Sequence, residues 1–312
     1  MTDVNRTTVR IPTPSGFDIE AWFYLPEGSG PFPAVVMGHG LGAVKVGGLA
    51  SFAERFCREG FAAVVIDYRQ WGGSEGQPPR DELNVPRQRE DYSAAIGWAA
   101  AQPDIDEHRI FVWGTSFAGM HATALAASDH RLAGAIAQCP LVDGLAGSRL
   151  VRPSRSLALF ATAIIDRVGS LLGRAPIYLP VNVAPGEWGI ADTSDALFGK
   201  KVMHPREPVD WHNRIAARSL LTVPADRSTN DLWRTTSCSV DDLQNEAGAG
   251  APVSLVPAAR SHSDPEPLSW KSFASWQFGI RLQRSSLMRS QMLSSLRQVD
   301  RRCVLCWNQL IS

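Results

Sequence analysis

The sequence predicts an α/β protein in which a mostly parallel sheet carries helices on both faces. Short apolar runs of strand length recur along the first 140 residues, at positions 34–37, 61–66, 110–113 and 133–139. Between them lie stretches with the helical spacing of apolar residues, at 49–59, 88–101 and 120–127. Uninterrupted apolar runs are typical of strands buried on both faces, and their alternation with helices is the pattern of a parallel sheet.

An antiparallel hairpin is expected before this series. Residues 7–12 and 19–26 alternate between apolar and polar side chains, and Ser15-Gly16 stands between them as a turn. Alternation of this kind indicates strands with one buried face, so we place the hairpin at one edge of the sheet. The next strand, at 34–37, ends at the glycine-rich turn Gly38-His39-Gly40-Leu41-Gly42.

The third apolar run leads into Gly114-Thr115-Ser116-Phe117-Ala118, with Gly119 one position later. A strand, a sharp turn and a helix form the setting in which the pattern G-x-S-x-G presents a nucleophilic serine at the carboxyl end of a sheet. The turn strains the backbone of its central residue, so the flanking residues must be small, and Ala118 meets that need in place of glycine. The sequence therefore predicts Ser116 as a catalytic nucleophile.

The regular alternation stops near residue 140, and the chain is divided accordingly. We interpret residues 1–140 as the N-terminal part of the core, 141–215 as a helical cap insertion, 216–284 as the C-terminal part of the core, and 285–312 as a poorly ordered tail rich in serine and arginine. Further strands are expected at 219–226 and 252–262, with a closing helix at 272–282. The apolar helix predicted at 157–172 is expected to line an apolar substrate pocket.

Composition excludes several classes of partner. The 312 residues carry 31 basic and 31 acidic side chains, so no basic surface indicates nucleic acid binding. Neither a signal peptide nor an apolar run of about 20 residues is present, and a cytoplasmic protein with no membrane partner is expected. The five cysteines are scattered, and the lone pair Cys303 and Cys306 suggests neither a metal nor a redox role. The sequence does not predict the oligomeric state.

A serine nucleophile requires a histidine base, and the histidine requires a carboxylate to orient it. In this architecture the order along the chain is serine, acid, histidine, which Ser116, Asp226 and His262 satisfy. Asp143 and Asp264 remain alternative acids. The backbone N–H groups of Leu41 and Phe117 are the expected oxyanion donors.

The other six histidines are given no catalytic role. His39 stands in the glycine-rich turn, where a structural or hole-shaping role is expected. The remaining five are expected to be exposed to solvent: His108, His121, His130, His204 and His212.

Three motifs together resemble those of the α/β-hydrolase superfamily. They are the glycine-rich turn at 38–42, Asp67-Tyr68-Arg69 followed by Trp71-Gly72-Gly73-Ser74-Glu75-Gly76, and the serine motif at 114–119. Within the superfamily the chain is similar to the branch of dienelactone-hydrolase-like and Xaa-Pro-peptidase-like proteins, which includes the polyketide transferases and hydrolases of fungal secondary-metabolite clusters. The likeness runs from about residue 8 to 213 and includes Pro185-Gly186-Glu187.

The resemblance implies acyl-group chemistry through an acyl-serine on an ester, thioester or lactone, without a metal or organic cofactor. The expected partner is a small-molecule acyl substrate with a sizeable apolar acyl part. Where the family has a Gly-His-Phe phrase after its last strand, this chain has Arg260-Ser261-His262-Ser263-Asp264. A second alignment leaves no catalytic histidine and gives the alternative interpretation, a hydrolase-shaped auxiliary or binding protein with an incomplete triad.

Overall fold

A seven-stranded sheet forms the centre of the molecule. The computed structural model describes residues 5–138, 140–141, 144, 151–202, 204–205, 207–223 and 303–306, and every structural statement below concerns these residues. Along the sheet the strand order is β1 (Asn5–Pro12), β2 (Asp18–Leu25), β4 (Ala62–Ile66), β3 (Phe32–Gly38), β5 (Ile105–Thr115), β6 (Gly134–Gln138) and β9 (Cys303–Cys306). The pairs β1–β2 and β2–β4 are antiparallel and the other four pairs are parallel, which confirms the predicted mostly parallel sheet with an antiparallel hairpin at its edge.

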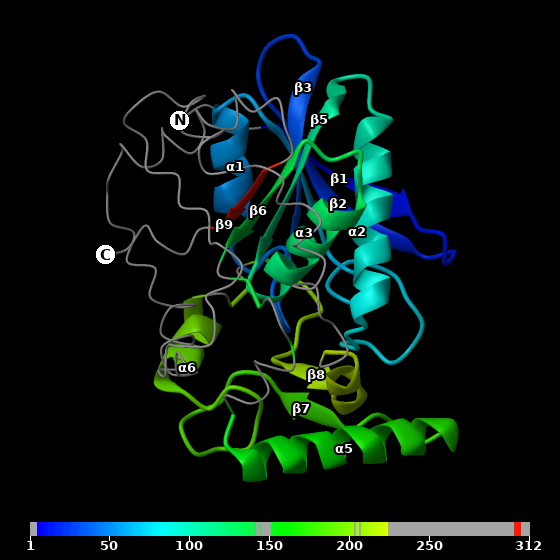
Figure 1. Cartoon of the computed structure of the whole chain (residues 1–312), viewed down its shortest axis with the longest axis vertical. Coiled ribbons are helices and arrows are strands. Elements are labelled where there is room, and N and C mark those ends of the chain that lie inside the picture. Colours follow the sequence, from blue (N-terminus) through cyan, green and yellow to red (C-terminus); the bar gives the residue numbers. More distant parts are fainter. Residues whose placement is uncertain are drawn as a thin grey trace, which may run out of the picture.

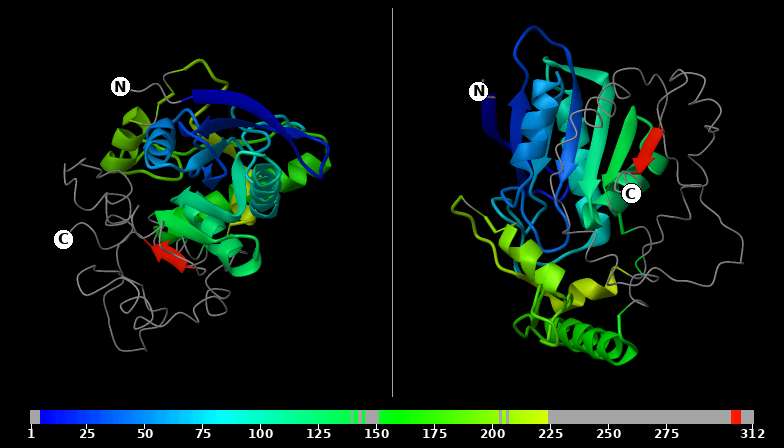
Figure 2. Two further views of the ribbon diagram at one scale, coloured as in Figure 1. Left: turned by 90° about the horizontal axis from the view of Figure 1, so that it is seen from above. Right: turned by 90° about the vertical axis from the view of Figure 1, so that its left-hand side faces the viewer.

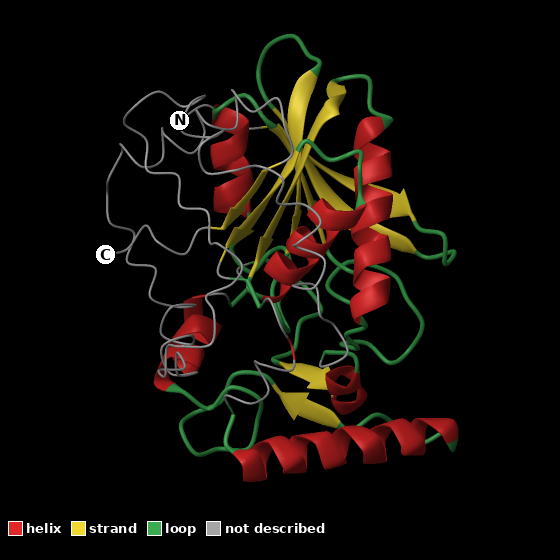
Figure 3. Ribbon diagram, viewed as in Figure 1, coloured by secondary structure: helices red, strands yellow, loops and turns green. Residues whose placement is uncertain are grey.

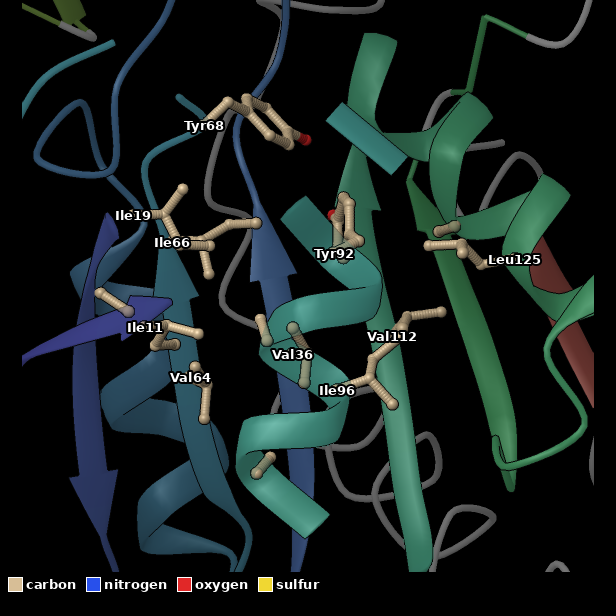
Figure 4. Packing of buried hydrophobic residues seen from close by; sticks show 14 of the residues in the cluster. Ile11, Ile19, Val36, Val64, Ile66, Tyr68, Tyr92, Ile96, Val112 and Leu125 are labelled. Carbon is tan, nitrogen blue, oxygen red and sulfur yellow. The ribbon is translucent and has the colours of Figure 1, made fainter. Parts of the chain in front are cut away.

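Helices cover both faces of this sheet (Figures 1 and 3). Because side chains alternate along a strand, Val36, Val64 and Val112 face a core shared with α2 (Val85–Ala100) and α3 (Phe117–Ser128), as Figure 4 shows. Their neighbours face the opposite core against α1 (Ala50–Arg58). Residues of both kinds are buried, which explains why the parallel strands read as uninterrupted apolar runs rather than as alternating ones.

Helix α2 begins three residues before the predicted start at residue 88. The side chain of Asn84 accepts a hydrogen bond from the backbone N–H of Arg87, and Pro86 occupies the first turn. An asparagine cap followed by a proline is a strong signal for a helix start. The asparagine side chain accepts a hydrogen bond from one free N–H group of the first turn, and the proline has no N–H that would need a partner.

The segment from residue 151 to 221 lies beyond the edge at which the parallel strands end (Figures 1 and 2). It contains α5 (Pro153–Leu171), β7 (Tyr178–Pro180), α6 (Ser194–Val202), β8 (Arg214–Ala216) and the 3₁₀-helix η1 (Ala217–Leu221), with β7 and β8 paired antiparallel. Hydrogen bonds fasten it to the loops that follow β3 and β4. The Trp211 indole donates to the carbonyl of Gly42 at 2.8 Å, and the Leu83 N–H donates to the Ser219 hydroxyl at 2.8 Å.

The strand predicted at 219–226 is wrong in its described part, because residues 217–221 form η1 instead. Two side chains of η1 have partners on different elements, which a helical turn allows. The Arg218 guanidinium pairs with Asp166 of α5, with Nε and Oδ2 2.8 Å apart, while the Ser219 hydroxyl accepts from Leu83. These contacts attach η1 to α5 on one side and to the loop before α2 on the other.

Four residues of the predicted tail belong to the sheet. Cys303–Cys306 form β9, which pairs in parallel with β6 from Gly134 to Ala137, although the segment 285–312 was expected to be poorly ordered. The sequence of β9, Cys-Val-Leu-Cys, is a short apolar run of the kind that suits a sheet strand. The rest of the tail, the strand predicted at 252–262 and the helix predicted at 272–282 lie outside the described residues.

Among the described helices, none has both the length and the apolar character needed to cross a membrane.

Candidate active site

Ser116 occupies the sharp turn between β5 and α3, with a φ of 56° and a ψ of −114°. A positive φ is rare for any residue other than glycine and costs on the order of 1–3 kcal/mol, so it persists only where the surroundings impose it. Here both sides of the turn are tied to the end of β6. The N–H of Ser116 donates to the carbonyl of Gln138 at 2.9 Å, and the N–H of Leu141 donates to the carbonyl of Ser116 at 3.0 Å.

Both glycines that flank Ser116 are required by close backbone contacts. A Cβ atom at Gly114 would collide with the carbonyl oxygen of Ala118, and one at Gly119 would lie 2.9 Å from the Cα of Pro140. Ala118 itself is fully buried and its side chain is accommodated, so alanine replaces glycine in the fifth position of the motif without a clash. Helix α3 starts at Phe117, directly after the turn and three residues before the predicted start.

The glycine-rich turn after β3 passes beside Ser116. A Cβ at Gly40 would lie 3.3 Å from the Cβ of Ser116 and 3.7 Å from its Oγ, so a side chain here would crowd the hydroxyl. Leu41 is the next residue of this turn, and Phe117 is the first residue of α3, whose N–H has no partner within the helix. Both predicted oxyanion donors therefore belong to backbone segments that adjoin Ser116.

The predicted partners of Ser116 lie outside the described residues. This holds for Asp226 and His262, and for the alternative acids Asp143 and Asp264. The described residues nearest to them in the sequence are Val223 and Gly144, and a Cβ atom at Gly144 would collide with the carbonyl oxygen of Val223. Within the described chain, no group of three or more His, Cys, Asp or Glu side chains is placed to hold a metal ion.

His121 was predicted to be exposed but is fully buried, because both faces of α3 are covered. Its Nε2 lies 2.9 Å from the Oε1 of Gln88, and its ring meets those of Phe117 and Tyr68 at centroid distances of 5.3 and 5.8 Å. His39 is buried as well, with Nδ1 3.1 Å from the carbonyl oxygen of Gly40 and its ring 4.5 Å from that of Tyr68. The two histidines thus belong to an aromatic layer beneath the turn of Ser116.

The other exposure predictions agree with the structure. His130, His204 and His212 are exposed, and the side chain of His108 retains 88% of its accessible surface.

Burial lowers the pKa of both His39 and His121, the latter well below the ordinary 6.5, because desolvation penalises imidazolium. Both rings therefore bind fewer protons in the folded protein than in the unfolded chain near and below pH 6.5. The unfolded state binds more protons as the pH falls, so stability should decrease below about pH 6.5, by up to about 1.4 kcal/mol per pH unit for each histidine.

Thermal melts between pH 7.5 and 5.5 check this expectation. The variant His121→Gln keeps a donor for Gln88 but cannot titrate, so its melting temperature should fall less over this range than that of the wild type. Replacing the exposed His108 with glutamine should leave the slope unchanged. If the melting temperature fell equally with pH in all three proteins, His121 would not be a buried histidine that loses stability by remaining neutral.

A buried ion-pair network fixes the loop that follows the glycine-rich turn and leads to α1. The carboxylate of Asp67, fully buried at the end of β4, accepts from the N–H of Lys45 at 2.7 Å and from the Lys45 ammonium at 2.5 Å. The same ammonium reaches Oε1 of Glu20 at 2.7 Å, and the N–H of Gly73 donates to Asp67 at 3.1 Å. The loop between β3 and α1 is thereby anchored to β2, β4 and the following turn.

This network explains the motif Asp67-Tyr68-Arg69, whose two charged ends are both buried and paired. Arg69 pairs with Asp91 of α2, with Nη2 and Oδ1 2.6 Å apart. Sequence reasoning assigned no role to Lys45 or Glu20. The sequence does contain a signal, because Lys45 is the one charged residue in the otherwise apolar stretch 41–50, which indicates a buried charge. Its partners could not be predicted, because they lie on or after strands that are neighbours only in the folded sheet.

Comparison with known proteins agrees with this geometry. Residues 15–159 match the model of the X-Pro dipeptidyl-peptidase (S15 family). The quorum-quenching protein AidA of Acinetobacter baumannii is 41% identical over 203 residues, which cover 65% of this chain and 66% of AidA. The polyketide transferase ATR5 of Stachybotrys chlorohalonatus is 32% identical over 208 residues, which cover 64% of this chain and 67% of ATR5. The chain thus spans about two thirds of the length of these relatives.

A solved structure extends the likeness to three dimensions. The α/β hydrolase GrgF from a Penicillium species superposes with a TM-score of 0.63 at 27% sequence identity, over 77% of this chain and 84% of GrgF. The superposition and the sequence matches reach the same conclusion as the strand order and the turn at Ser116. The chain belongs to the α/β-hydrolase superfamily, on the branch that contains the fungal polyketide transferases.

Proposed function

We propose that this protein is a serine-dependent hydrolase or acyltransferase that acts on an ester, thioester or lactone, with Ser116 as its nucleophile. The observation that carries the proposal is the positive φ of Ser116 at a strand-to-helix turn. That strain costs stability, and the backbone hydrogen bonds of residue 116 to Gln138 and Leu141 maintain it. Strain of this kind is typical of turns that hold a nucleophilic hydroxyl toward a substrate carbonyl.

The proposed mechanism has the usual two acyl-transfer steps. The hydroxyl of Ser116 adds to the substrate carbonyl while His262 accepts its proton, and the oxygen that becomes negative is stabilised by the N–H groups of Leu41 and Phe117. His262 then gives the proton to the leaving group, and Asp226 keeps the imidazole oriented. Water or another nucleophile attacks the acyl-serine in the second half, so hydrolysis and transfer share one enzyme form.

The positive end of the dipole of α3 adds to the oxyanion site. Phe117 is at the first helical position, so its free N–H and the dipole of a 12-residue helix act on the same point. On the opposite side, the turn that carries Leu41 is held by the buried Lys45 and Asp67 pair. A rigid pair of donors needs no rearrangement when charge develops, which is the condition under which such donors lower a barrier.

The substrate is proposed to be a small molecule with a sizeable apolar acyl part, and the names of the relatives give two starting points. AidA is named for quorum quenching and ATR5 for polyketide transfer. We therefore propose an acyl ester, lactone or thioester of the polyketide kind as the first substrates to test, with a role in secondary metabolism for the whole protein.

Assays on matched p-nitrophenyl esters, acyl thioesters and acyl lactones, each with and without an added alcohol or amine acceptor, test this proposal. Turnover of at least one class with a burst of the first product equal to the enzyme concentration is expected, because an acyl-serine accumulates when its breakdown is slow. Absence of any turnover in the folded protein would favour the alternative, a binding or auxiliary protein with an incomplete triad.

Replacing His262 with alanine tests the base. A loss of at least about 10³-fold in kcat is expected, as for the removal of a triad member elsewhere. The acid is identified by comparing alanine variants of the three candidates, Asp226, Asp143 and Asp264. It is the residue whose replacement lowers kcat nearly as much as His262→Ala does. A loss below about tenfold in His262→Ala would show that another group is the base.

A further inference from the structure

Helix α5 exposes a continuous apolar face. Six large side chains on it are accessible to solvent to between 44% and 72%: Leu157, Phe160, Ile164, Ile165, Val168 and Leu171. At 100° per residue these positions fall within one side of the helix, which we call the apolar stripe. α5 is also the outermost helix beyond the carboxyl edge of the sheet (Figure 1).

The attachment of α5 to its own protomer uses the opposite side. Leu159 is buried there against Leu179 of β7 and Ala217 of η1, and Ala163 is also fully buried. On the same side, Asp166 forms a bidentate ion pair with Arg218, with distances of 2.8 and 2.9 Å. The apolar stripe therefore contributes nothing to the packing of α5 within the described chain. The apolar pocket expected along 157–172 stays a prediction, because the exposed side chains lie on the side of α5 away from its contacts with β7 and η1.

We infer that the apolar stripe is the contact surface for a second copy of this chain, paired antiparallel about a two-fold axis at Ile164. Four of the other five side chains of the stripe are arranged symmetrically in sequence about that residue, and Ile165 is the exception because its counterpart, Ala163, is buried on the opposite side of α5. Leu157 and Leu171 lie seven residues on either side of Ile164, and Phe160 and Val168 lie four residues on either side. In an antiparallel pair each leucine meets the other leucine of the partner, and each phenylalanine meets a valine, so the surface is complementary to itself as a two-fold interface requires.

Charge favours the same occupant. Arg167 is the one exposed charged residue of α5, and in this register it lies opposite Ala161, a small side chain, rather than opposite another arginine. A basic partner would gain no acidic contact on the exposed side of α5. Exposed arginines border the helix, Arg152 before it and Arg174 after it, so an anionic lipid surface is the competing occupant that the experiments below exclude.

The area is also adequate. From its exposed fractions the stripe presents on the order of several hundred Å² of apolar surface, which is the size at which exposed patches mark interaction sites and approaches the roughly 800 Å² per partner of a standard interface. Leu172, 67% exposed, and Ile177, 39% exposed, extend the patch beyond the end of the helix and supply further contact.

Sedimentation equilibrium or light scattering on the full chain tests the inference. The wild type should have twice the mass of the 34.0 kDa chain at micromolar concentration. Ile164→Asp places two carboxylates against each other on the axis and should give a monomer with an unchanged circular dichroism spectrum and melting profile. The matched control is Phe198→Asp, which changes a residue of α6 that is 57% exposed and lies off the stripe; it should remain a dimer.

A mixing experiment tests the antiparallel register directly. Ile164→Asp and Ile164→Lys should each be monomeric alone, and a one-to-one mixture should restore a dimer, because opposite charges then meet on the axis. The inference would be overturned if the wild type were monomeric up to about 100 µM, or if Phe198→Asp dissociated the dimer as fully as Ile164→Asp does. It would also be overturned if monomers bound lipid vesicles through the stripe.

Discussion

Replacing Ser116 with alanine should reduce kcat/KM on every acyl substrate by about 10³-fold or more, because the acyl-serine can no longer form and only the oxyanion donors and binding remain. The fold should be unaffected. Alanine keeps the Cβ that the turn already accommodates, and the backbone hydrogen bonds of residue 116 to Gln138 and Leu141 do not involve the hydroxyl.

The matched control for this substitution is Ser128→Ala, near the end of the same helix. The hydroxyl of Ser128 donates to the carbonyl of Ala124 at 3.0 Å, on an exposed surface away from the turn. Its activity should equal that of the wild type. If Ser116→Ala retained more than about a tenth of the wild-type rate while Ser128→Ala was normal, another group would have to be the nucleophile.

Replacing Lys45 with methionine should lower the free energy of unfolding by about 3–5 kcal/mol, the range seen when one partner of a buried ion pair is removed. Methionine matches the length of the lysine stem, so the main change is that Asp67, fully buried, loses its cation. Because Lys45 anchors the loop that carries Leu41, kcat should fall more than the change in stability alone accounts for at temperatures where the variant is folded.

Urea unfolding and steady-state kinetics on three variants separate these effects. The double variant Lys45→Met/Asp67→Asn should regain part of the lost stability, since no unpaired carboxylate remains. Lys201→Met, on the exposed side of α6, is the matched control and should lie within about 0.5 kcal/mol of the wild type. If Lys45→Met also changed the free energy of unfolding by no more than about 0.5 kcal/mol, water would have to reach Asp67 and the ion-pair network would be weak.

The sheet could be predicted from the sequence because its strands are buried on both faces. The apolar runs that became β3, β4, β5 and β6 depend only on local composition, and the glycines that punctuate them are fixed by close contacts such as that of Gly114 with Ala118. The turn at Ser116 was predictable for the same reason, since a strand, a small residue and a helix follow one another within a few positions.

Features that depend on distant partners were not predictable. His121 lies in a helix that is apolar on nearly every side, which itself indicates burial, but the partner that allows a polar ring inside the core is Gln88, 33 positions earlier. The segment expected to start a strand at residue 219 forms a 3₁₀-helix. Its Arg218 side chain binds Asp166, and its Ser219 hydroxyl accepts a hydrogen bond from the N–H of Leu83, which lies in another part of the chain. Lys45 has two acidic partners that only the sheet order brings together.

Labelling with a fluorophosphonate probe tests the central claim, an activated serine at position 116, most directly. The probe transfers its phosphonyl group to a serine oxygen with loss of fluoride, and the reaction requires a base that activates the hydroxyl. The account predicts one label per chain, located by peptide mass spectrometry on Ser116, which disappears in Ser116→Ala and is retained in Ser128→Ala. Folded protein that takes up no label, or a label that persists in Ser116→Ala, would contradict it.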